Sequence, residues 1–163
     1  MAHGRLSFEV NRISSAPPET LFALETDGAN WSQWSKPVIA QSSWDRQGDH
    51  EPGGLGAIRK VGLWPMFLRE ETVGYEQDRR HVYRFIGPFQ PVRDYRAEVV
   101  FAPTPAGGTD LRWTASFRAS SLPGVDLATL FLNRMIIRAL AARLIRAAER
   151  INQQATTDQR SRL

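Results

Sequence analysis

The chain has 163 residues, 42% of them hydrophobic, which is enough to bury the core of one domain. Its formal net charge at pH 7 is +4, and acidic residues are interspersed with the basic ones, so the dense basic stripe that nucleic-acid binding requires is missing. Because the sequence has no cysteine, it excludes a disulfide, a thiol nucleophile and a thiolate metal site. We therefore expect one domain over residues 1–163, with its core at about 6–152, that binds no nucleic acid.

The first segment predicts a strand, because Leu6, Phe8 and Val10 alternate with polar residues. The residues before it lack the hydrophobic region of a signal peptide, and no hydrophobic run in the chain reaches membrane-spanning length. We expect a cytoplasmic protein without an integral membrane segment.

Two short helices are expected after this strand. Residues 17–18 are prolines suited to a first helical turn, Glu19 places a negative charge near the N-terminus of the helix, and Gly28 ends it. Residues 30–34 predict a second helical turn that lays two tryptophans against a sheet.

Six further strands are predicted from short runs of β-branched and aromatic residues that are bounded by turn residues. They are expected at residues 38–46, 56–63, 67–76, 81–86, 95–101 and 111–117. The chain shows no internal repeat and no linker.

Residues 125–153 predict one long C-terminal helix, which no Pro or Gly interrupts. Its C-terminal half is amphipathic, whereas hydrophobic residues surround most of its N-terminal half. Such a helix is either buried on several sides or covers a hydrophobic space. We therefore expect an α+β fold, in which about seven antiparallel strands form a sheet that curves around this helix. Residues 155–163 lack periodicity, and we expect them to be disordered.

The order of elements and five sequence segments resemble the polyketide cyclase/dehydrase branch of the START-like superfamily (SRPBCC), also called helix-grip or Bet v 1-like. The segments are residues 16–22, 27–34, 53–59, 69–73 and 107–113. The resemblance covers roughly residues 6–151. It implies a seven-stranded antiparallel sheet curled around the terminal helix, with a cavity for a hydrophobic small molecule. No catalytic residue transfers, because these segments are landmarks of the fold.

Metal or hydrolase chemistry has little support in the sequence. The three histidines show no paired ligand spacing, and no nucleophile elbow, P-loop or dinucleotide fingerprint stands in a suitable context. We therefore expect no metal and no cofactor.

Arg69 and Glu71 are the charged candidates for the site. If Val73 and Tyr75 face the concave side of the sheet, Arg69 and Glu71 share that face, since strand side chains repeat every two residues. We expect both to point into the cavity, where they could orient a ligand or serve as electrophile and general base. The alternatives are a register shifted by one residue or a surface ion pair at a wet rim.

The remaining candidates are aromatic or hydrophobic and are expected to line the cavity. They are Tyr83, Tyr95, Trp113, Phe117, Phe131 and Met135. The tyrosine hydroxyls could bind a ligand oxygen, while the rings could equally fill the core. We expect Trp113 and Phe117 to form part of the core or of the cavity wall rather than to have a chemical role.

Two further features have open alternatives. Residues 63–67 form an apolar cluster at a strand connection, which could be a cavity lid, a subunit interface or a segment packed on the sheet end. The arginines of the terminal helix could meet acidic lipid or a ligand carboxylate, or form a solvated helix flank.

The sequence favours binding of a hydrophobic or amphipathic small molecule, lipid- or polyketide-like, between the sheet and the terminal helix. The second hypothesis is a polyketide cyclase or dehydratase with a buried acid/base pair, and the third is a purely structural role. Whether the protein is an enzyme stays open. A monomer or a weak homodimer is expected.

Overall fold

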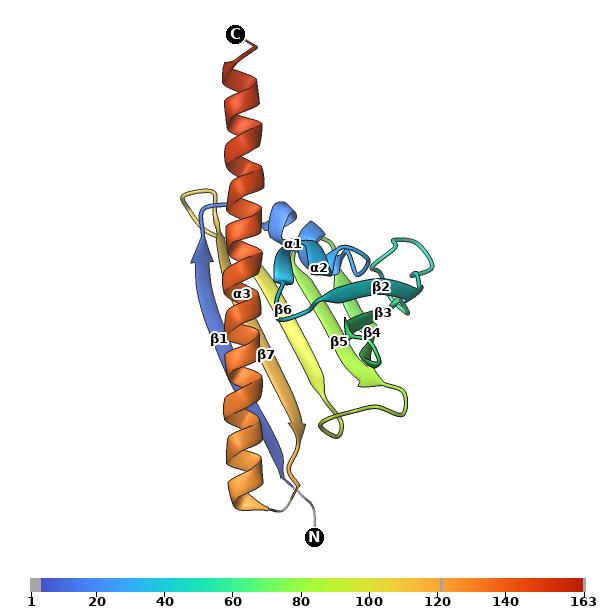
Figure 1. The fold of residues 1–163 in the computed structure, drawn as a ribbon. Helices are drawn as coiled ribbons and strands as arrows, with labels where there is room; N and C mark the ends of the chain where they lie inside the picture. Colours follow the sequence, from blue (N-terminus) through green and yellow to red (C-terminus); the bar gives the residue numbers. More distant parts are fainter. Residues whose placement is uncertain (1–3, 121, 163) are drawn as a thin grey trace.

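The computed structural model describes residues 4–120 and 122–162. In this part of the chain seven strands form one antiparallel sheet, in the order β1-β7-β6-β5-β4-β3-β2 (Figure 1). The strands are β1 (Arg5–Ser14), β2 (Gln41–Arg46), β3 (Ile58–Leu63), β4 (Met66–Glu76), β5 (Arg80–Ile86), β6 (Arg96–Pro103) and β7 (Thr109–Arg118). The predicted α+β fold is confirmed, and the N-terminal strand pairs with the last strand at one edge of the sheet.

Two short helices, α1 (Pro18–Thr26) and α2 (Trp31–Ser35), connect β1 to β2. Pro18 starts α1, where a missing N–H costs nothing, and Glu19 lies in the first turn. Helix α1 packs on β5 and β6, and α2 packs on β2. Figure 1 shows both helices at one end of the sheet, so they cover that end of its concave face.

The long helix α3 (Pro123–Arg160) runs along β1 and also contacts α1 and α2. Its last turns project beyond the sheet (Figure 1). The expectation of disorder is wrong for residues 155–160, because α3 continues to Arg160 without an intervening Gly or Pro; Leu163, the last residue of that stretch, lies outside the described residues. The hydroxyls of Thr156 and Thr157 donate to carbonyls one turn earlier. Among the described residues, no helix combines the length and hydrophobicity needed to cross a membrane.

The core lies between the concave face of the sheet, α1, α2 and the middle of α3, where the buried residues run from Ile137 to Ala148. Cross-strand pairs such as Phe8 with Ala115 and Ala97 with Ala115 form its floor. One irregularity matters for the site, because the pairing of β4 with β5 shifts between Thr72 and Gly74. This β-bulge inserts one residue into β4 and changes which side chains face inward.

Candidate functional site

Four of the sequence-predicted residues lie on the concave face and are buried: Tyr83, Tyr95, Trp113 and Phe117. Trp113 donates its indole N–H to the Tyr83 hydroxyl at 3.2 Å, and the Tyr95 ring stacks on Phe85 with 3.9 Å between ring centroids. Burial raises the pKa of both tyrosines, so their hydroxyls remain protonated at neutral pH. A ligand-binding role for these residues stays a prediction.

Arg69 and Glu71 lie on the opposite face of β4, which corrects the expectation that they point into the enclosed space. Arg69 forms an ion pair with Asp45, and Glu71 pairs with Arg84 at 2.7 Å. The β-bulge explains the error, because it places Thr72 and Tyr75, three residues apart, opposite Tyr83 and His81 on the inner face. Tyr75 does face inward, but Glu71 does not share its face, because the bulge between them interrupts the alternation of side chains along β4.

Phe131 and Met135 also differ from expectation, with 66% and 46% of their surface exposed. The buried seam of α3 includes Ile137, Leu140 and Leu144. At helical spacing the same seam continues toward the N-terminus through Asn133, Leu130 and Asp126. Phe131 and Met135 fall outside this seam, so they face solvent rather than the sheet.

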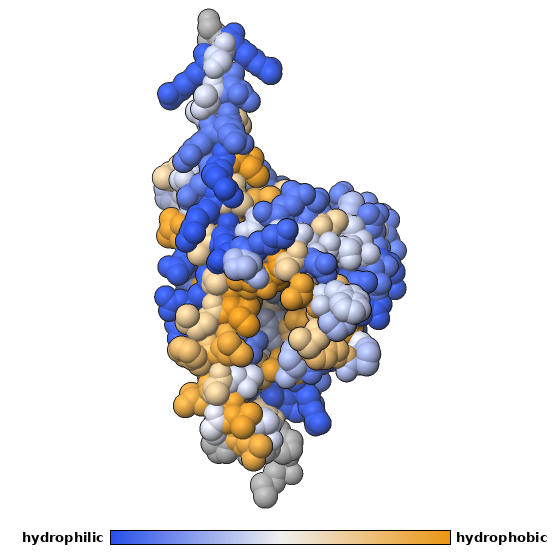
Figure 2. Space-filling model, viewed as in Figure 1, coloured by the Kyte–Doolittle hydropathy of each residue, from blue (hydrophilic) through white to orange (hydrophobic). Residues whose placement is uncertain are grey.

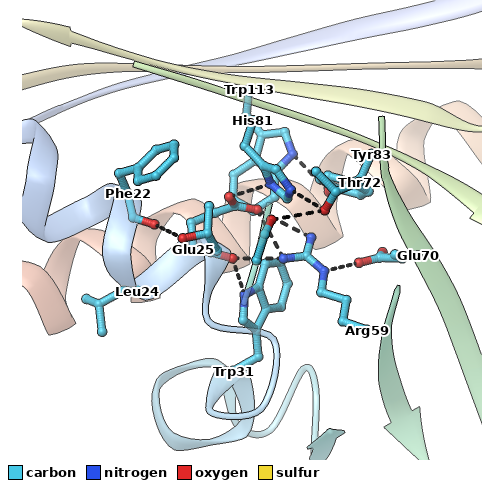
Figure 3. A network of polar contacts seen from close by, with 12 residues as sticks. Phe22, Leu24, Glu25, Trp31, Arg59, Glu70, Thr72, His81, Tyr83 and Trp113 are labelled. Atoms are coloured by element: carbon cyan, nitrogen blue, oxygen red, sulfur yellow. Dashed lines mark hydrogen bonds and ion pairs between the residues drawn. The ribbon is translucent and has the colours of Figure 1, made fainter. Parts of the chain in front are cut away.

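The concave face carries a buried charged cluster that is centred on Arg59 of β3 (Figure 3). The Arg59 guanidinium donates from Nε to Glu70 at 2.5 Å and from Nη1 to the backbone carbonyl of Glu25 at 2.8 Å. It also stacks 3.9 Å from the Trp31 ring centroid and 4.5 Å from that of Tyr83. Arg59 therefore joins β3 and β4 to the C-terminal end of α1, where a cation is favourable.

A second part of the cluster connects α1 to β5 and β4. Nδ1 of His81 lies 2.7 Å from Oε2 of Glu25, and neither atom has another polar partner among the described residues. Nε2 of His81 lies 3.0 Å from the Thr72 hydroxyl, which also donates to the Gly53 carbonyl at 3.3 Å. Glu25 and His81 are 0% and 1% exposed, so this acid/base pair is sealed from solvent.

Two carboxylates, one guanidinium and one imidazole share this interior. Burial raises the pKa of Glu25, but the attraction of His81 and Arg59 outweighs it, and the pKa is lowered overall. Burial likewise opposes the charge of Arg59, while Glu70 and Glu25 raise its pKa and keep it protonated. The cluster is therefore held together by charges that compensate one another in a dry environment.

This arrangement predicts acid sensitivity. Because the pKa of Glu25 is lower in the folded state than its usual 4.5, unfolding takes up a proton at acidic pH. The stabilisation is present above about pH 4.5 and is lost as the pH falls through the folded-state value. We expect urea unfolding between pH 3 and 7 to show a shallower pH dependence in Glu25→Gln than in the wild type. Glu9→Gln on the exposed surface is the control, and equal slopes in all three proteins would contradict the assignment.

Sequence reasoning missed the four ionisable groups Glu25, Arg59, Glu70 and His81. One signal was present, since Glu25 follows Leu21 by four residues and so shares the buried face of α1. The partners lie on three different strands, and their meeting depends on a strand register that the sequence does not reveal. The described residues contain no group of three or more His, Asp and Glu side chains that could hold a metal ion.

The sequence pattern of a family described as polyketide cyclase / dehydrase and lipid transport matches residues 5–152. The chain belongs to this polyketide cyclase/dehydrase and lipid transport family. The match extends from the start of β1 through most of α3, and it confirms the resemblance seen in the sequence. A search of curated protein sequences found no match.

Two solved structures have the same fold as this family member. The crystal structure of Ara h 8.0201 is 18% identical with a TM-score of 0.63, and the alignment covers 86% of this chain and 98% of that one. A Nitrosospira multiformis protein, a Northeast Structural Genomics Consortium target, is 16% identical with a TM-score of 0.66 and coverages of 86% and 94%. The helix-grip, Bet v 1-like architecture is thus shown. Family and fold together support binding of a hydrophobic ligand in general.

Proposed function

We propose that this protein binds a hydrophobic or amphipathic small molecule, lipid- or polyketide-like, between the concave face of the sheet and the N-terminal half of α3. The observation that carries the proposal is a set of concave-face hydrophobic residues that remain partly exposed at the end of the sheet away from α1 and α2. They are Leu6 of β1, Leu68 of β4 and Phe85 of β5. Leu130 of α3 is also partly exposed and packs against the same core.

Leu6 and Phe85 belong to one row across the sheet, whereas Leu68 lies two residues along β4 from Glu70, the residue that pairs with Phe85. Leu6 pairs with Phe117 of β7, and Phe85 stacks on Tyr95, which precedes β6. The row therefore runs from the edge strand β1 to the middle of the sheet as a hydrophobic wall. Small-molecule sites are typically lined by such apolar and aromatic side chains with few polar groups. The family description, which names polyketide cyclases, dehydrases and lipid transport, supports the same ligand class.

Two neighbouring leucines of α3 test this site. Leu130 packs toward the core, whereas Leu132 is 59% exposed on another side of the helix. We expect Leu130→Arg to weaken the 1:1 binding of a fluorescent fatty acid by at least tenfold, because a guanidinium would enter the hydrophobic wall. Leu132→Arg is the matched control and should bind as the wild type does. Fluorescence titration measures both, after circular dichroism has shown that each variant is folded.

Equal probe affinity in both variants and the wild type would remove the proposed site. Loss of probe binding in Leu132→Arg alone would place the probe on the outer side of α3 and would contradict the proposal as well.

An acid/base enzyme is the second candidate, and the Glu25–His81 contact is the observation that favours it. A histidine oriented by a carboxylate can abstract and return a proton, and Arg59 could stabilise an enolate. The burial of both groups favours binding over catalysis, because substrate would have to displace the side chains that cover them. Native mass spectrometry of the recovered ligand separates binding from dehydration. A carrier returns the molecule unchanged, whereas a dehydratase returns it lighter by one water.

A further inference from the structure

The N-terminal half of α3 exposes hydrophobic side chains on the side that faces away from the sheet. These residues are 40% to 69% exposed, and they are Val125, Leu127, Phe131, Leu132, Met135 and Ile136. Figure 2 shows a hydrophobic area, broken by paler residues, over this half of the helix. Soluble monomers rarely expose so many large hydrophobic residues together, so the area indicates a contact surface. It lies outside the buried seam of α3 and is separate from the proposed ligand site.

After Asp126 in its first turn, α3 carries only positive charges along this surface. Residues 127–148 contain no Asp or Glu, but they include Arg134, Arg138, Arg143 and Arg146. Arg134 lies within the exposed hydrophobic segment and Arg138 two residues beyond it, and neither forms an ion pair with the part of the chain that the structure describes. A hydrophobic helix face flanked by unpaired arginines is the pattern of a helix that lies in the interface of a membrane.

The turn between β3 and β4 adds a second exposed hydrophobic group. Leu63, Trp64 and Met66 are 61%, 74% and 64% exposed. Figure 2 shows a smaller hydrophobic area to the right of α3, where Figure 1 places this turn. Tryptophan is the residue most suited to the boundary between lipid and water, because its ring is large and its N–H is polar.

We propose that this face docks on the surface of a membrane that contains anionic lipids, with the N-terminal half of α3 lying in the plane of the interface. The hydrophobic side chains would enter the boundary of the acyl chains, and the arginines would bind lipid phosphates. The contact is peripheral, in keeping with the absence of a membrane-spanning helix among the described residues. It does not depend on the proposed ligand site, although it would place that site next to lipid.

Charge complementarity favours a lipid surface over a second copy of the chain. Packing α3 against α3 of another copy through this face would bring the arginines of both copies together. No carboxylate between residues 127 and 148 is available to neutralise them. An anionic bilayer supplies the missing negative charge and accepts the hydrophobic residues at the same time.

Co-sedimentation of the full chain with vesicles tests the proposal. We expect binding to vesicles of phosphatidylcholine with phosphatidylglycerol, and at least tenfold weaker binding to phosphatidylcholine alone. Phe131→Asp should abolish binding, and Arg134→Gln with Arg138→Gln should weaken it about tenfold or more, since each basic residue near an anionic surface contributes about 1 kcal/mol. Ile13→Asp is the matched control, because Ile13 is 67% exposed on β1, and it should bind as the wild type does.

Three results would overturn the proposal. The first is that the protein binds neither kind of vesicle. The second is that Phe131→Asp and Ile13→Asp both bind vesicles as the wild type does. The third is a protein that does not bind vesicles but forms a dimer in light scattering, with Phe131→Asp dissociating the dimer. This result would identify a second copy of the chain as the occupant of the surface. Fatty-acid binding that is lost in Leu130→Arg would stand in each of these cases, so the two proposals fail separately.

Discussion

Replacing Arg59 with methionine is expected to lower the free energy of unfolding by about 3–5 kcal/mol, because it leaves buried carboxylates without their main cation. Glu25 and Glu70 would lose the guanidinium that contacts both of them. The carbonyl at the end of α1 would lose one of its donors. Methionine keeps much of the side-chain volume, so the loss reports on charge and hydrogen bonding rather than on a cavity. Urea unfolding at pH 7 measures the change.

Arg84→Met is the control for this experiment. Arg84 also pairs with a glutamate, Glu71, but the pair lies on the outer face of the sheet and Arg84 is 55% exposed. Exposed pairs contribute about 0–1 kcal/mol, so the control should stay within that range. If Arg59→Met cost no more than Arg84→Met, the cluster would not hold α1 to the sheet.

Replacing Trp113 with alanine has the second largest expected effect. The side chain is 0% exposed, contacts Trp31 edge-on at 6.2 Å between ring centroids, and donates to Tyr83. We expect a loss of about 3–5 kcal/mol, the range for truncation of a large buried aromatic residue. The Tyr83 hydroxyl would also lose a partner. Thermal and urea unfolding measure the loss.

Met135→Ala is its counterpart, because the sequence pattern placed both residues in the cavity wall. Met135 is 46% exposed, so its truncation should change stability by no more than about 0.5 kcal/mol. A large loss from Met135→Ala, or a small one from Trp113→Ala, would contradict the packing of α3 and of the concave face.

The fold was largely predictable because its signals are local. Alternation of hydrophobic residues identified β1 and β7, and Pro18 and Gly28 marked the limits of α1. Adjacent strands joined by short turns pair antiparallel, so the pairings of β3 with β4, β4 with β5 and β6 with β7 followed from the order of the strands, whereas the pairing of β1 with β7 did not. These signals do not depend on where distant residues meet.

The site was less predictable because it depends on register and on helix orientation. A single inserted residue in β4 reversed the assignment of Arg69 and Glu71, and the only local sign of this bulge is Gly74, an isolated glycine within the strand. In α3, hydrophobic residues around most of the circumference left the direction of the helix undetermined. Only the packed seam through Ile137 and Leu144 shows that Phe131 faces outward.

Photo-crosslinking with a diazirine-bearing fatty acid tests the central claim most directly, that a hydrophobic ligand binds between the sheet and the N-terminal half of α3. Mass spectrometry of the crosslinked protein should locate the adducts at or next to Leu6, Phe85 and Leu130, and Leu130→Arg should remove them. Adducts confined to Leu127, Phe131 and other outward residues of α3, or unchanged adducts in Leu130→Arg, would contradict the claim.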